Sequence, residues 1–275
     1  MREVIGLDAR ALVASLMGRL SPEQQVQLRW RLRRLARPAW LGTIRRTSPL
    51  SERWGLDRGT PVDRWYIEEF LGNHQADIQG RVLEVKDSGY ANRFGRQVTR
   101  FDVLDIDPSN PKATLIADLS AANDIGADQF DCFVLTQTLQ FIENPAAAIS
   151  HAHRILRPGG VLLCTVPAVS RIDGALHDVD YWRFTPASCS RLFGDGFPGG
   201  DVSVRSFGNV LSAVAFLIGM ASEELSSREL NVQDAYYPVI VGVRAVKSGL
   251  ADDCPASNWA SPEGREAPAG KHRGG

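Results

Sequence analysis

The sequence predicts an α/β fold: a doubly wound, mostly parallel sheet of seven strands, preceded by a helical extension at the N-terminus. The main observation is that short apolar runs alternate with segments of helical spacing from residue 80 onward. Strands interleaved with helices form parallel sheets that helices cover on both faces. A second observation is size, because 275 residues, of which 44% are hydrophobic, can bury a large core. With 23% charged residues, the composition excludes a wholly disordered, collagenous or disulfide-scaffold chain.

The helical extension is assigned to residues 1–53. Its first helix has an apolar stripe, because a leucine recurs every fourth residue at Leu12, Leu16 and Leu20. The second helix begins at Ser21, where Pro22 occupies the first turn and Gln24 can complete a capping box. We expect this helix to end before Pro38.

The extension is also strongly basic. Residues 1–54 carry eleven arginines and four acids, a net charge of +7, whereas residues 55–247 carry a net charge of −7. One interpretation is a nucleic-acid or anionic-membrane surface. We favour a helix that docks on the acidic body or pairs with a second copy, because most charge runs are solvated faces. We therefore expect a homo-oligomer through the N-terminal helices and no nucleic acid as a partner.

The domain that carries the sheet is assigned to residues 54–247. Its expected strands are residues 81–85, 101–107, 113–118, 130–135, 161–166, 201–207 and 239–246. Residues 145–156 have helical spacing and stop at a Pro-Gly-Gly turn over residues 157–160, and residues 210–221 form a further apolar helix. The tail, residues 248–275, is rich in Ala, Pro, Gly and Ser and is predicted to be disordered.

The cysteines and histidines indicate no metal site. The four cysteines show no metal-ligand spacing, and Cys132 and Cys164 lie in apolar runs typical of buried thiols. His151 and His153 are two residues apart on a helix, so their side chains point in different directions. We find no signal peptide and no transmembrane segment in the sequence, and we expect a cytoplasmic location.

Acidic residues mark the ends of the first three strands. In a doubly wound sheet, ligands bind beyond the carboxyl ends of the strands, where the strand order reverses. Glu84 lies near the end of the first strand, Asp105 and Asp107 end the second, and Asp118 ends the third. Asp105 follows Glu84 by 21 residues, the spacing at which a carboxylate commonly holds a ribose diol. The alternative is that Asp105 or Asp107 only caps the turn at Pro108.

Five segments between Arg81 and Pro167 form a recognisable series: VLEV, DVLDIDP, ATLIADL, FDCFVLTQTLQFIENP and RILRPGGVLLCTVP. This series resembles class I S-adenosylmethionine-dependent methyltransferases, particularly the type 11 group. Two further stretches, WGLDRGTPVDRWYIEEFL and HDVDYWRFT, resemble a subgroup often associated with glycan and polysaccharide assembly. The resemblance covers residues 54–247. It implies a Rossmann-like methyltransferase fold and S-adenosylmethionine as cofactor.

The resemblance also implies how the cofactor would lie. Glu84 would stand near the methionine ammonium, and Asp105 or Asp107 would bind the ribose. Asp118 would lie near the adenine amino group, with Leu119 as its apolar neighbour. These residues belong to the ends of the first three strands, in agreement with the positional argument above.

The loop after the first strand departs from the family pattern. The family has G-x-G-x-G there, whereas Lys86, Ser88 and Tyr90 stand at those three positions here. We expect the backbone to turn away from the cofactor, with Gly89 at the turn because glycine adopts positive φ freely. Lys86 would pair with Asp87 or with the cofactor carboxylate. Lys86 and Gly89 are therefore counted among the cofactor-binding residues.

At the methyl-transfer end, the resemblance places Thr136 and Gln137 beside the methyl group, with strand-end capping as the alternative. In-line displacement from a sulfonium needs a positioned nucleophile and at most a base. His177, with Asp178 beside it, is the candidate base, and the alternative is a histidine on a surface loop. Arg183 is either a clamp for an anionic substrate or part of a structural ion pair.

These observations predict methyl transfer from S-adenosylmethionine to a hydroxyl or amine of a small molecule or glycan. The altered loop motivates an alternative, a catalytically inactive or repurposed methyltransferase-like domain that is a partner in glycan or metabolite assembly. A nicotinamide-dependent oxidoreductase is disfavoured, because no G-x-G-x-x-G follows the first strand.

Overall fold

The computed structural model describes residues 20–36, 42–121 and 124–249, and the chain divides into two compact units, Met1–Pro49 and Leu50–Gly275. Two sequence-based predictions lie outside the described residues: most of the first helix, and the disordered tail beyond residue 249. Within the described ranges, no helix is long and apolar enough to cross a bilayer.

The first unit contains α2 (Pro22–Ala36) and a short 3-10 helix, η1 (Gly42–Ile44). The predicted capping box begins α2. The Ser21 backbone N–H donates to Gln24 Oε1 at 2.9 Å, and the Gln24 N–H donates to Ser21 Oγ at 3.3 Å. Two donors that a helix start leaves unpaired are thereby satisfied.

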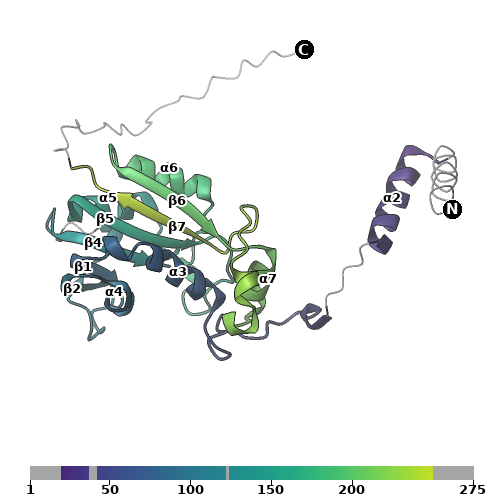
Figure 1. Cartoon of the computed structure of the whole chain (residues 1–275), viewed down its shortest axis with the longest axis horizontal. Coiled ribbons are helices and arrows are strands. Elements are labelled where there is room, and N and C mark those ends of the chain that lie inside the picture. Colours follow the sequence, from purple (N-terminus) through teal and green to yellow (C-terminus); the bar gives the residue numbers. More distant parts are fainter. Residues whose placement is uncertain (1–19, 37–41, 122–123, 250–275) are drawn as a thin grey trace, which may run out of the picture. The chain divides into compact units, whose positions relative to one another are not determined.

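The second unit is built on a seven-stranded sheet of order β3-β2-β1-β4-β5-β7-β6 (Figure 1). The strands are β1 (Gly80–Val85), β2 (Val98–Asp105), β3 (Leu115–Ile116), β4 (Phe130–Thr136), β5 (Leu156–Pro167), β6 (Asp201–Phe207) and β7 (Ile240–Val246). The first five are parallel, and β7 is antiparallel to both β5 and β6. The predicted fold class is therefore confirmed. The strand order reverses between β1 and β4, which makes this edge of the sheet the expected ligand site.

Helices cover both faces of the sheet (Figure 1). One face packs against α5 (Pro145–Ile155) and α6 (Pro186–Gly196). The other packs against α3 (Val62–Asn73), α4 (Gly89–Phe94), α7 (Val210–Ile218) and α8 (Ser227–Leu230). The described part of the chain also has the 3-10 helices η2 (Gln75–Asp77), η3 (Leu119–Ala121), η4 (Leu139–Phe141), η5 (His177–Val179) and η6 (Ser222–Glu224).

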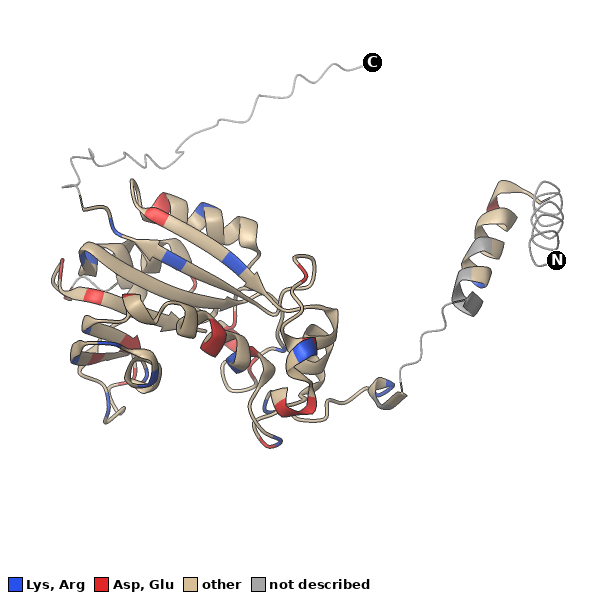
Figure 2. Cartoon of the chain, viewed as in Figure 1, with Lys and Arg blue, Asp and Glu red and all other residues tan. Residues whose placement is uncertain are grey.

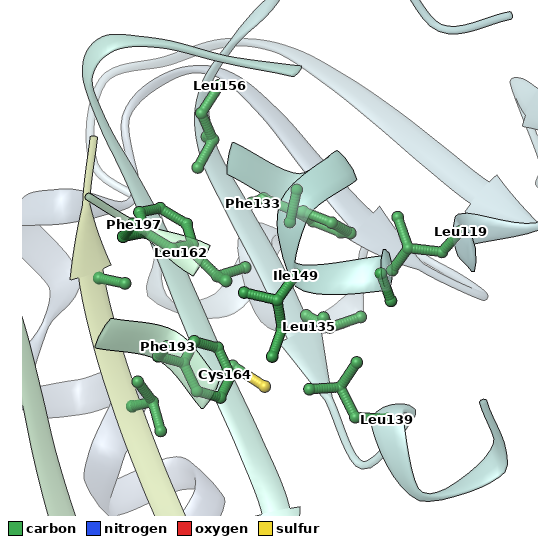
Figure 3. Packing of buried hydrophobic residues seen from close by; sticks show 14 of the residues in the cluster. Leu119, Phe133, Leu135, Leu139, Ile149, Leu156, Leu162, Cys164, Phe193 and Phe197 are labelled. Atoms are coloured by element: carbon green, nitrogen blue, oxygen red, sulfur yellow. The ribbon is translucent and has the colours of Figure 1, made fainter. Parts of the chain in front are cut away.

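Strand β4 shows why its central residues, 132–135, are all apolar. Phe133 and Leu135 belong to the core on the α5 side, whereas Cys132 and Val134 belong to the core on the α3 side. Figure 3 shows Ile149 of α5 among the side chains of the first set. A strand that is buried on both faces has no polar positions in its alternation. Acidic and basic residues are interspersed over the helices and loops of this unit, and the central strands carry few (Figure 2).

Several element boundaries differ from the predicted ranges, and for two of them the backbone conformation gives the reason. The residues of the predicted turn, 157–160, lie inside β5. They form an irregularity near the start of this strand, where Gly159 adopts a φ of +78° and the register with β4 shifts. Helix α7 ends at Ile218 rather than at residue 221, because Gly219 adopts a left-handed φ of +79° as its C-cap.

Candidate active site

A cavity of about 910 Å³ lies at the carboxyl ends of β1, β2 and β4, where the strand order reverses. Eight of the nine predicted cofactor positions line it: Glu84, Lys86, Gly89, Asp105, Asp118, Leu119, Thr136 and Gln137. These residues come from four segments of the chain, and parallel strands bring their ends to one edge. The ninth position, Asp107, is not among the lining residues.

Glu84 joins the end of β1 to the start of α4. Its side chain is buried, with 3% of the residue exposed, and its carboxylate accepts N–H bonds from Tyr90 at 3.1 Å and Ala91 at 2.8 Å. Burial raises the pKa of Glu84 to about 7, although both hydrogen bonds favour the charged form. Glu84 thus holds the first turn of α4 against the cavity wall.

The loop after β1 turns at Lys86, and the prediction that Gly89 makes this turn is wrong. Lys86 has a φ of +70°, whereas Gly89 begins α4 and has no positive φ. The Lys86 N–H donates to Leu104 O at 3.0 Å, and its carbonyl accepts from Asn110 Nδ2 at 2.8 Å. These bonds to β2 and to the loop after it hold Lys86 in a conformation that side chains seldom adopt.

Asp87 does not pair with Lys86, contrary to one expectation. Its carboxylate accepts the Gly89 N–H at 2.9 Å and lies 3.5 Å from Lys112 Nζ. The Lys86 side chain is exposed at the cavity rim.

The two acids at the end of β2 have different positions. Asp105 is buried and lines the cavity, and its carboxylate accepts from Asn110 Nδ2 at 2.6 Å and from the Asp107 N–H at 3.0 Å. Asp107 is exposed and accepts the Ser109 N–H at 2.8 Å, and hydrogen bonds from Ser109 hold its pKa below the ordinary value. Asp105 is therefore the acid that faces the cavity, whereas Asp107 caps the turn at Pro108.

Asp118 and Leu119 form the wall at the end of β3. Asp118 Oδ1 accepts from both the N–H and the hydroxyl of Ser120, each at 2.8 Å, and this caps η3. Leu119 is buried beneath it and gives this wall an apolar surface.

Gln137, after the end of β4, has a strained backbone with a φ of +46°. Its N–H donates to Thr165 O at 2.8 Å, and its carbonyl accepts from Gln140 Nε2 at 2.9 Å. Its own Nε2 is buried and has no hydrogen-bond partner within the described residues. Strain and an unpaired buried donor at one residue are features of binding sites.

A second cavity of about 260 Å³ adjoins the first. Four residues line both: Asp63, Arg64, Gln137 and Phe141. The rest of its wall includes Trp54, Arg171 and Arg183. Because the two cavities share these residues, a molecule in the small cavity would meet a molecule in the large one beside Asp63 and Gln137.

The segment before α3 positions Trp54 and Asp63. The Leu50 N–H donates to Ile218 O at 2.6 Å, and the Ser222 N–H donates to Thr60 O at 2.7 Å. These two bonds join both ends of the segment to the chain that follows α7. Trp54, in the middle of the segment, has a positive φ of 56° and donates its Nε1–H to Ser170 Oγ at 3.2 Å.

Asp63 is the acid that the sequence analysis missed. It lies in the first turn of α3, half-buried, and its Oδ1 accepts the Arg64 N–H at 2.9 Å. Burial raises the pKa of Asp63 to about 6. The sequence contained one signal for it, its place in the stretch WGLDRGTPVDRWYIEEFL, but that stretch precedes the strands from which site residues were sought.

The predicted base lies elsewhere. His177 and Asp178 are in η5, with side chains 64% and 87% exposed, and they pair with each other at 3.2 Å. Neither lines a cavity, whereas Leu176 and Val179 do. Side chains three residues apart eclipse on a 3-10 turn, so Leu176 and Val179 share the inner face and the two residues between them point outward.

Arg183 forms a structural ion pair rather than a free clamp. Its Nη1 and Nη2 donate to the two carboxylate oxygens of Asp180, Nη2 at 3.0 Å, and Nη2 also donates to Arg171 O at 2.9 Å. The Arg183 guanidinium holds the pKa of Asp180 below its ordinary value.

Comparisons with known proteins agree with this geometry. A family model described as a methyltransferase domain matches residues 44–193, which is more than half of the chain. No curated protein gives a significant match.

Several solved structures are similar to this chain at low sequence identity. An S-adenosylmethionine-dependent methyltransferase from Mesorhizobium loti is 17% identical, with a TM-score of 0.47 over 68% of this chain and 100% of that one. A Thermotoga maritima protein of the same description is 18% identical, with a TM-score of 0.46 over 72% and 94%. The [4+2]-cyclase SpnF is 16% identical, with a TM-score of 0.47 over 70% and 83%. At these identities and TM-scores, the likenesses carry no argument about the reaction.

Proposed function

Because the chain belongs to the methyltransferase-domain family, with S-adenosylmethionine as its cofactor, we propose that it methylates a hydroxyl or amine of a small molecule or glycan. The observation that carries the proposal is the pair of adjoining cavities. The large one has the predicted cofactor residues on its wall, and it meets the small one at Asp63 and Gln137.

The residues of the large cavity fit the cofactor. Its volume of about 910 Å³ lies within the range of about 300–1,000 Å³ that is usual for ligand sites. Asp105 would accept hydrogen bonds from the ribose hydroxyls, and Asp118 and Leu119 would face the adenine. Glu84, which lines the cavity beside the turn at Lys86, would face the methionine end of the cofactor. When bound there, S-adenosylmethionine supplies an electrophilic methyl group on its sulfonium.

Asp63 is proposed as the general base. It lines both cavities, and a carboxylate with a pKa of about 6 is largely ionised at neutral pH while remaining a stronger base than an ordinary aspartate. The proton would pass from the acceptor hydroxyl or ammonium to the Asp63 carboxylate. Gln137, whose buried Nε2 is unpaired in the described structure, would orient the acceptor by donating a hydrogen bond.

Calorimetric titration with S-adenosylhomocysteine tests the cofactor assignment. Asp105→Ala should weaken binding by about 1–3 kcal/mol, the scale of a charge-assisted hydrogen bond. Asp107→Ala is the matched control and should leave the affinity unchanged, because Asp107 caps a turn outside the cavity. Equal affinities for the wild type and Asp105→Ala would contradict the assignment.

The same titration bears on the alternative of a repurposed domain. That alternative is favoured by one observation, the Lys86 side chain at the rim of the large cavity. If the wild type binds no cofactor but Lys86→Gly does, the side chain blocks the site and the enzyme proposal fails.

A further inference from the structure

Three residues that line the small cavity each have a buried polar atom that no described residue satisfies. These atoms are Arg171 Nη1, Gln137 Nε2 and Gln140 Oε1. Gln140 is only 6% exposed. Buried polar groups without partners are costly and therefore rare, and two donors with one acceptor in one wall indicate a polar ligand.

Three arginines line this cavity, and two of them, Arg171 and Arg183, differ in their partners. Arg183 is neutralised by Asp180 and is fully engaged. Arg171 has no ion pair in the part of the chain that the structure describes, and its guanidinium lies over the Trp54 ring with Cζ 4.8 Å from the centroid. Trp54 is itself held by Ser170. Arg171 is therefore a cation that is fixed in place but has no anion.

The surrounding charges limit which anion would fit. Asp63 and Asp173 also line the small cavity, and Asp173 Oδ1 already accepts the Ala175 N–H at 2.8 Å. Arg64 also lines the cavity, so outside the Arg183–Asp180 pair two guanidinium groups are balanced by two carboxylates, and this balance favours a monoanion over a phosphate dianion. A planar carboxylate also matches the fork of the guanidinium.

We infer that the small cavity takes an acceptor that carries a carboxylate, which Arg171 binds while the hydroxyl or amine to be methylated reaches Asp63 and Gln137. This inference rests on the proposed function, because it names the substrate class of the same site. The volume of about 260 Å³ restricts the bound part to a single small ring or a short chain. Gln140 Oε1 would accept a hydrogen bond from a further hydroxyl or N–H of that part.

The test measures discrimination between acids and their amides. The protein is first titrated with S-adenosylhomocysteine and is then studied with that ligand bound. Acetate, benzoate and 4-hydroxybenzoate are compared with acetamide, benzamide and 4-hydroxybenzamide by following the Trp54 indole N–H in nitrogen–proton spectra. We expect at least one acid to bind about tenfold more tightly than its amide. This is the difference in affinity expected from one charge-assisted hydrogen bond.

Two variants make the result specific. Arg171→Met should abolish the preference for the acid, and Arg171→Lys should retain part of it. Arg191→Met is the matched control, because Arg191 lies on the exposed face of α6, paired with Asp195 and remote from both cavities. An acid preference that survives in Arg171→Met would overturn the inference, and so would the absence of any preference in the wild type.

A failure of the proposed function is recognised separately. If S-adenosylhomocysteine does not bind, the methyltransferase proposal fails, and the acid titrations are repeated on the free protein to test Arg171 alone. If it binds but acids and amides behave alike, only the carboxylate inference fails. Phosphate is included as a further probe, and tighter binding of phosphate than of every acid would overturn the choice of a carboxylate.

Discussion

At the scale of single residues, position relative to the two cavities separates Asp63 from the histidine that the sequence favoured. Asp63 is half-buried between the cavities, whereas His177 is exposed on the outer side of η5. The same distinction separates Asp105 from Asp107, which are only two residues apart. In each pair, the residue with the proposed role is the one that lines a cavity.

Asp63→Asn should lower the turnover number by about 10²–10⁴-fold, the usual contribution of a general base, without weakening cofactor binding. In the wild type, the rate should rise with pH through about 6 and then level off, because the base acts only when deprotonated. Initial rates between pH 5 and pH 8 measure this. A rising limb that persists unchanged in Asp63→Asn would assign the base to another group, and His177→Asn serves as the comparison.

At the scale of elements, the loop between β1 and α4 shows how backbone hydrogen bonds replace glycine. Lys86 remains at a positive φ because its N–H and carbonyl are both bonded to neighbouring segments, Leu104 in β2 and Asn110 in the following loop. Gly89 has a different environment, since a Cβ there would meet only the Asp87 carboxylate, at 3.0 Å. Position 86, rather than position 89, is therefore the one whose backbone must adopt a positive φ.

Substitutions at the two positions should destabilise the fold to different extents. Lys86→Val should destabilise the fold by about 1–2 kcal/mol, because a β-branched side chain is strongly disfavoured at positive φ. Gly89→Ala should cost less, because the exposed Asp87 side chain can shift and alanine favours the helix. Urea unfolding of both variants measures this difference. A larger loss of unfolding free energy in Gly89→Ala than in Lys86→Val would show that the turn depends on Gly89 instead.

At the scale of the whole molecule, an ion pair joins the last strand of the sheet, β7, to η2, which precedes the first strand. Arg244 of β7 donates to both carboxylate oxygens of Asp77 in η2, at 2.8 and 2.9 Å. Burial alone would raise the pKa of Asp77, but hydrogen bonds from His74 and Arg244 hold it well below its ordinary value. The pair ties the last strand to the segment that leads into the first.

Arg244→Met should lower the free energy of unfolding by about 1–3 kcal/mol at neutral pH, since it leaves a partly buried carboxylate with a weaker partner. The lowered pKa means that this stabilisation is present above the unfolded value of about 4 and is lost as the pH falls through the folded value. Unfolding curves at pH 7 and pH 3 should therefore show a smaller difference between variant and wild type at pH 3. A constant difference would show that packing, rather than charge, is responsible.

The division into two compact units leads to a prediction about the basic extension. If residues 1–49 pair with a second copy, a protein that lacks them should retain cooperative unfolding but become a monomer. Light scattering coupled to size exclusion measures the mass of both forms. An unchanged mass together with lost binding to anionic vesicles or nucleic acid would instead favour the surface-binding interpretation.

The sequence by itself determined the sheet and most of the residues that line the large cavity. Burial of a strand on two faces is recorded in consecutive residues, as in Phe130–Thr136, and capping at Ser21 involves residues three apart. The carboxyl ends of parallel strands must share an edge, so Glu84, Asp105 and Asp118 could be placed together without coordinates. All of these inferences depend on local patterns and one topological rule.

Only the tertiary structure decided which groups line the same cavity. Asp63 and Gln137 both line the two cavities because α3 packs on the sheet, although they are 74 residues apart in a sequence whose periodicity does not encode this. The outward orientation of His177 depends on the register of a single 3-10 turn. The left-handed turn at Lys86 depends on acceptors and donors beyond the loop itself. Side-chain direction and backbone strain are set by such long-range contacts, which the order of residues along the chain does not display.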